Sequence, residues 1–173
     1  VARAMGADSV KTLEYTGLGV NFAPGQSQTP GQRWPRFNLK TFTRTINYDQ
    51  KSGAEDMVFA EAVFGGQRQN TQVNQDKAWN IGANGPAPQL AAAEERQLML
   101  WLTPHGFVKA ALAEGETTLS EANGVSTITT RAFGKYTVTG TVDAQHRVTH
   151  VATTTANPVL GDIAWTADYT DYA

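Results

Sequence analysis

The chain has 173 residues, 14 of them basic and 16 acidic, for a net charge of −2, and it contains no cysteine. This balance argues against a nucleic-acid-binding protein, which normally carries a basic patch. Without cysteine the chain has no disulfide framework, no CxxC zinc site and no cysteine nucleophile. No apolar run approaches the roughly 20 residues that a membrane-spanning helix needs, so we expect no membrane span. The length predicts a single domain over residues 1–173.

Both ends of the chain stop inside a predicted element. Residues 1–7 are typical of the last turns of a helix, and residues 163–172 alternate as a strand that no turn closes. We therefore expect this chain to be a fragment of a longer protein.

The first half of the chain predicts an antiparallel meander. Thr12–Phe22 is rich in β-formers and alternates, whereas the Pro, Gly and Gln residues of segment 24–36 predict a loop. Further strands are expected between later turn signals. The four strands predicted in this half are Thr12–Phe22, 37–49, 56–64 and 71–81.

The middle of the chain predicts two short helices. Residues 89–102 contain the strongest helix formers, and Leu98, Trp101 and Leu102 fall at i, i+3 and i+4 as a core-facing stripe. Thr103 followed by Pro104 predicts an N-cap and first turn of a second helix over residues 105–113.

Strands return after the helical pair. Asn123-Gly124 lies between two β-rich runs and predicts a hairpin with a type I′ turn. We expect an α+β, mostly β fold: a strongly curved antiparallel sheet of about nine strands, an incomplete β-barrel, with the helical pair on its concave face. The predicted strands of this half are 117–122, 125–133, 135–142, 146–155 and 163–172.

No catalytic or metal-binding set emerges from the sequence. His146 and His150 lie four residues apart, but on a strand this separates them by about 13 Å, too far for one zinc ion. None of the five serines lies in a GxSxG motif, and no phosphate-binding glycine motif occurs. We expect no catalytic residue, no metal ligand and no cofactor in this chain.

Large apolar side chains suggest a ligand site between helices and sheet. A Pro-hinged helical pair over an incomplete barrel predicts a partly apolar groove that would hold a lipid or another apolar small molecule. A filled core without a cavity is the alternative. The predicted lining residues are Trp79, Trp101, Phe107, Leu112 and Phe133.

The segments RQLMLWLTPHGFVKAAL and ANPVLGD carry a resemblance that extends over the whole chain. They are similar to the N-terminal region of exported bacterial hydrolases of the metallo-β-lactamase fold. In that family the region precedes the hydrolase domain, whose HxHxDH ligands this chain lacks. The resemblance implies a periplasmic or secreted protein whose partner is the downstream hydrolase domain, with zinc only in that domain.

These observations suggest two alternative functions for the chain. The first is a non-catalytic accessory domain that packs beside the hydrolase domain or covers its substrate entrance. The second is a free-standing periplasmic carrier or sensor of lipids or other apolar ligands, because the order of strands and helices also looks like that of periplasmic lipoprotein carriers.

Overall fold

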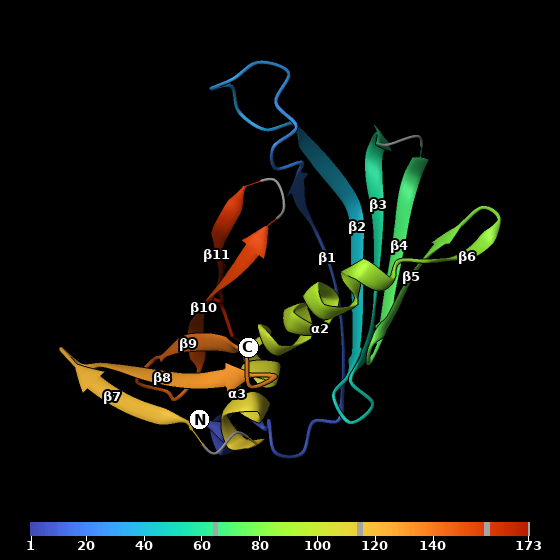
Figure 1. Ribbon diagram of the computed structural model, residues 1–173. Helices are drawn as coiled ribbons and strands as arrows, with labels where there is room; N and C mark the ends of the chain where they lie inside the picture. Colours follow the sequence, from blue (N-terminus) through green and yellow to red (C-terminus); the bar gives the residue numbers. More distant parts are fainter. Residues whose placement is uncertain (64–65, 114–115, 158–159, 173) are drawn as a thin grey trace. The chain divides into compact units, whose positions relative to one another are not determined.

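The computed structural model describes residues 1–63, 66–113, 116–157 and 160–172 (Figure 1). The chain forms two compact units, one from Val1–Val10 with Leu98–Ala173 and the other from Lys11–Gln97. No helix of the described ranges has the length and apolar character needed to cross a membrane. The elements in chain order are α1 (Ala2–Met5), β1 (Thr12–Phe22), β2 (Arg36–Asn47), β3 (Ser52–Val63), β4 (Gly66–Asn74), β5 (Lys77–Gly82), β6 (Gly85–Pro88), the 3₁₀ turn η1 (Leu90–Ala92), α2 (Ala93–Trp101), α3 (Pro104–Ala113), β7 (Thr118–Ala122), β8 (Val125–Ala132), β9 (Tyr136–Val142), β10 (Val148–Asn157) and β11 (Gly161–Asp168).

The Lys11–Gln97 unit is an antiparallel meander of six strands, in the order β1 to β6. The prediction for β1 is confirmed to the residue, and it pairs with β2 around a bulge between Gly17 and Gly19. The expected strand over 71–81 is wrong, because the chain turns at Gln75 (φ 53°) and separates β4 from β5. Strand β6 has no counterpart in the sequence predictions. The predicted strand end at Phe64 lies outside the described residues.

The other unit contains a five-stranded antiparallel sheet in the order β11-β10-β9-β8-β7. The predicted type I′ turn is confirmed: Asn123 and Gly124 have φ values of 52° and 76°, and Ala122 pairs directly with Val125. Thr103 is the N-cap that the sequence predicts, since its Oγ1 accepts a hydrogen bond from the Gly106 amide at 3.3 Å.

The core of the five-stranded unit lies between α3 and the sheet. Leu98, Leu102 and Phe107 are buried there among valines of β9 and β10. The Phe107 ring lies directly over Gly140 of β9, where a Cβ would approach its Cζ to 2.6 Å. Gly140 thus leaves the space that the aromatic ring fills.

The predicted single curved sheet of about nine strands is wrong. The mostly β class with a mid-chain helical pair is confirmed, but the described strands number 11 and form two separate antiparallel sheets, without a closed barrel. The segment η1–α2–α3 lies between β6, the last strand of the first sheet, and β7, the first strand of the second.

Candidate ligand-binding site

Three aromatic side chains form a row at one end of the five-stranded unit. The ring centroids of Trp101 and Phe133 lie 6.5 Å apart, as do those of Phe133 and Tyr136, each pair edge to face. Phe133 remains 42% exposed. The Lys135 ammonium lies 4.9 Å from the centroid of the Tyr136 ring, in a cation–π contact. We call Trp101, Phe133 and Tyr136 the aromatic row.

The β8–β9 turn places Phe133 at the centre of this row. Phe133 and Gly134 both have positive φ, 56° and 63°, and the Lys135 amide donates to the Ala132 carbonyl at 3.1 Å. Glycine accepts such a φ readily, whereas a bulky side chain there costs about 1–3 kcal/mol. The turn therefore holds an aromatic ring at a position that backbone energetics alone would give to glycine.

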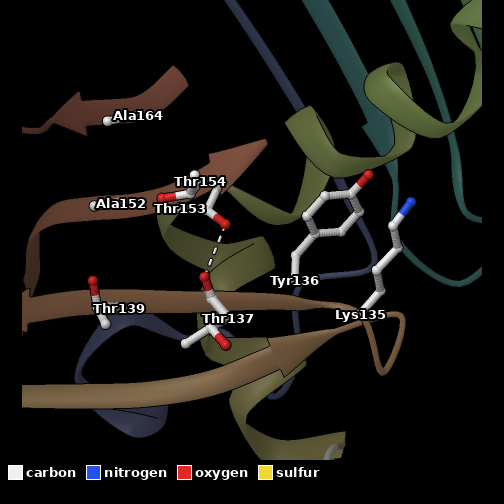
Figure 2. A pocket seen from close by; sticks show the side chains of 8 residues that line it. All are labelled: Lys135, Tyr136, Thr137, Thr139, Ala152, Thr153, Thr154 and Ala164. Atoms are coloured by element: carbon white, nitrogen blue, oxygen red, sulfur yellow. Dashed lines mark hydrogen bonds between the residues drawn. The ribbon is translucent and has the colours of Figure 1, made fainter. Parts of the chain in front are cut away.

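An open groove of about 460 Å³ adjoins the row on strands β9, β10 and β11 (Figure 2). Thr137 and Thr139 alternate along β9, and in the register of the sheet they lie on the face opposite the buried Val138 and Gly140. The Thr153 hydroxyl donates to the Thr137 carbonyl at 2.8 Å across the strands (Figure 2). The groove is lined by Lys135, Tyr136, Thr137, Thr139, Ala152, Thr153, Thr154 and Ala164.

The groove and the aromatic row offer two kinds of contact, with Tyr136 on the strand face of the buried Val138 and Thr137 and Thr139 on the opposite face. The hydroxyls of Thr137, Thr139 and Thr154 can donate and accept hydrogen bonds, whereas the buried Thr153 hydroxyl already donates to the Thr137 carbonyl. The Lys135 cation at the end of the groove attracts a negative charge. The rings of the aromatic row supply apolar faces for stacking. Together these groups suit a ligand rich in hydroxyls that also carries a carboxylate.

The residues that the sequence predicts to line a ligand groove lie in different environments of the structure. It brings Trp101 and Phe133 together, buries Phe107 completely and leaves Leu112 64% exposed on α3. Trp79 lies half-buried on β5 of the other unit. Of the predicted core stripe, Leu98 and Leu102 are buried as expected, whereas Trp101 is only half-buried.

Sequence reasoning missed the groove itself. The alternation of threonine in the β9 segment YTVTGTV was the available signal, because it places hydroxyls on one face of the strand and apolar residues on the other. Tyr136 and Lys135 were also missed, since the turn that brings them beside Phe133 depends on an unusual φ.

A charged cluster lies in the six-stranded unit. Arg44 Nε donates to Glu55 Oε2 at 2.8 Å, and its Nη1 donates to the Tyr15 hydroxyl at 3.2 Å. Burial raises the pKa of Tyr15, although the nearby Arg44 charge opposes this. Burial also disfavours the Arg44 cation, but Glu55 and Tyr15 together outweigh this effect and the pKa of Arg44 rises. Each charge is matched by a partner, which indicates a structural role.

Glu55→Gln should lower the free energy of unfolding by about 3 kcal/mol, because it leaves the Arg44 charge without its partner in a site where the two side chains are only 15% and 19% exposed. Asp56→Asn is the matched control on the same strand: its Arg68 partner is 66% exposed, so about 1 kcal/mol or less should be lost. Urea denaturation measures both. Equal losses would contradict the burial argument.

Arg96 of α2 anchors its helix to the same unit. It donates to the Gln72 and Trp79 carbonyls at 3.0 and 2.9 Å, and to Asn80 Oδ1 at 2.7 Å. Burial lowers the pKa of Arg96. The guanidinium thus satisfies backbone acceptors of β4 and β5, which again indicates a structural role.

The three histidines lie in separate environments. His150 on β10 pairs through Nδ1 with Asp168 Oδ1 of β11 at 2.7 Å, and His146 lies in a turn with φ 62°. His105 at the start of α3 contacts the Met5 carbonyl through Nε2 at 3.1 Å. No group of three possible metal ligands occurs among the described residues.

We predict that this chain binds no stoichiometric zinc. His150 and Asp168 offer two ligands on a sheet surface, whereas structural and catalytic zinc sites use three or four protein ligands. Elemental analysis after exhaustive dialysis checks this prediction, and one retained zinc ion per chain would contradict it.

No family model and no curated protein matches this chain.

Proposed function

We propose that this chain is a non-catalytic accessory module of an exported hydrolase of the metallo-β-lactamase fold. In this proposal, its five-stranded unit binds a hydroxyl-rich, acidic ligand for the hydrolase domain. The resemblance of the segments RQLMLWLTPHGFVKAAL and ANPVLGD to such proteins supports the accessory role. The proposed association with a hydrolase domain is thus supported by the sequence resemblance. The proposed binding role is supported by the geometry of the site.

The single observation that carries the binding role is the aromatic row beside the threonine-lined groove. Phe133 is held 42% exposed in a backbone conformation that disfavours it. Backbone strain of this kind clusters at active sites and ligand sites, which supports a binding role for this turn. A module with this surface would hold the ligand, and the hydrolase domain would supply the chemistry.

The competing function, a carrier of lipids, needs an apolar cavity. Within the five-stranded unit Phe107, Leu98 and Leu102 fill the space between α3 and the sheet, with exposures of 0%, 1% and 7%. Four of the eight residues that line the groove on β9, β10 and β11 are threonines. Hydroxyls suit sugars better than acyl chains, so the geometry favours the accessory module.

Two experiments test the two parts separately. Sequencing the gene past the codon for Ala173 should reveal an HxHxDH motif in frame, and a stop codon near that position would overturn the accessory role. A melting-temperature screen should show stabilisation by tri-galacturonate, of about 2.7 kcal/mol at a hundredfold excess over the dissociation constant. Stabilisation by oleate and not by tri-galacturonate would favour the carrier instead.

A further inference from the structure

Basic residues are concentrated in one stretch of the six-stranded unit. Between Tyr15 and Tyr48 the chain has four basic residues and no acidic one, although acidic residues predominate in the chain as a whole. Arg44 is neutralised by Glu55. The other three, Arg33, Arg36 and Lys40, are exposed and form no ion pair with any residue in the part of the chain that the structure describes.

An exposed apolar stripe lies on the adjacent strand. Leu18, Val20 and Phe22 of β1 point to one face of the sheet, and their exposures are 81%, 42% and 46%. Isolated exposed side chains of this kind are common, but three in a row on one strand face are not.

The strand register brings the two features together. Phe22 pairs with Arg36, Val20 pairs with Asn38, and Leu18 lies at the register shift, across from Lys40 and Thr41. Directly paired residues of an antiparallel sheet share a face, so Arg36 borders the apolar stripe at Phe22, and Lys40 lies further along the same strand. We call Leu18, Val20, Phe22, Arg33, Arg36 and Lys40 the hairpin patch.

The loop that joins β1 to β2 adds a tryptophan at the end of the patch. Trp34 is 45% exposed, and the base of its loop is closed by a 3.0 Å hydrogen bond from the Ala23 amide to the Pro35 carbonyl. The loop extends beyond the ends of the two strands (Figure 1). Tryptophan favours the boundary between lipid headgroups and acyl chains, where its ring is half in apolar surroundings.

We propose that the hairpin patch docks this protein onto a membrane surface that contains anionic lipids. Leu18, Val20 and Phe22 would enter the acyl boundary, while Arg33, Arg36 and Lys40 pair with headgroup phosphates just above it. Charge complementarity selects this occupant: the patch has three exposed cations that form no ion pair with the described residues. Their long side chains can extend to the headgroups while the apolar side chains enter the acyl boundary.

Vesicle flotation tests the proposal with the full chain. The protein should float with phosphatidylcholine vesicles containing about 30% phosphatidylglycerol and not with pure phosphatidylcholine. Raising the salt from about 0.05 to 0.5 M should weaken the binding. The triple variant Arg33→Gln, Arg36→Gln, Lys40→Gln should bind on the order of 100-fold more weakly, from about fivefold per cation.

A second triple variant controls for net charge. Lys11→Gln, Lys51→Gln and Lys77→Gln removes the same charge from the same unit and should leave binding within about twofold of wild type. Equal weakening by both triples would overturn the proposal, because total charge and not the patch would then govern binding. Circular dichroism of all variants verifies that they fold.

Separate variants test the contribution of the apolar residues and of Trp34 to vesicle binding. Leu18→Ser with Phe22→Ser should reduce flotation at both salt concentrations, and vesicles should shift tryptophan emission to the blue in wild type but not in Trp34→Phe. Absence of flotation by the folded wild-type protein at low salt would overturn the proposal. Binding to polyglutamate without binding to vesicles would also overturn it, in favour of an acidic protein partner.

Discussion

Phe107→Ala is expected to lower the free energy of unfolding by about 3–5 kcal/mol, since the ring is fully buried and its removal leaves a cavity between α3 and the sheet. Gly140→Ala alone should cost about 1–3 kcal/mol, because the new Cβ would lie 2.6 Å from Phe107 Cζ and 3.0 Å from Cδ1. Urea denaturation of the single variants measures both effects.

The double variant shows whether the two positions interact. With the ring removed, the alanine methyl group at position 140 occupies empty space and should restore part of the loss. The double variant should therefore be at least as stable as Phe107→Ala, with a coupling energy of about 1–3 kcal/mol. Additive losses would contradict the direct packing of Phe107 on Gly140.

Phe133→Gly is expected to weaken binding of tri-galacturonate on the order of tenfold, since a stacked aromatic ring is worth about 1.5 kcal/mol. Isothermal titration calorimetry measures the loss. The melting temperature should change little. Glycine removes two edge-to-face contacts, but it also accepts the φ of 56° without strain.

Leu119→Ala is the matched control for that variant. Leu119 is an apolar side chain of the same sheet, 65% exposed on β7, and it lies outside both the aromatic row and the groove. Its replacement should leave the affinity for tri-galacturonate unchanged. If both variants lost affinity equally, or if Phe133→Gly bound normally, the aromatic row would not be the binding site.

Local signals in the sequence predicted the elements well. Alternation gave β1 its limits, Asn123-Gly124 gave the β7–β8 turn, and Thr103-Pro104 gave the start of α3. Each of these depends on a few neighbouring residues. The strand over 71–81 failed because the turn at Gln75 contains no glycine or proline to mark it.

The pairing of strands into sheets could not be predicted in the same way. Whether β6 and β7 belong to one sheet depends on hydrogen bonds between distant segments, which no local pattern encodes. Only part of the candidate site could be predicted, because the rest also depends on contacts that form in the folded chain. Trp101 and Phe133 were chosen as large aromatic residues, but Tyr136 joins them only through the β8–β9 turn.

We propose that the aromatic row and the threonine-lined groove bind a ligand. Titration of ¹⁵N-labelled protein with tri-galacturonate, followed by backbone amide chemical shifts, tests it most directly. Binding at this site should perturb amides clustered at Phe133, Tyr136, Thr137, Thr139 and Thr154. Perturbations confined to other parts of the chain, or none at millimolar ligand, would contradict it.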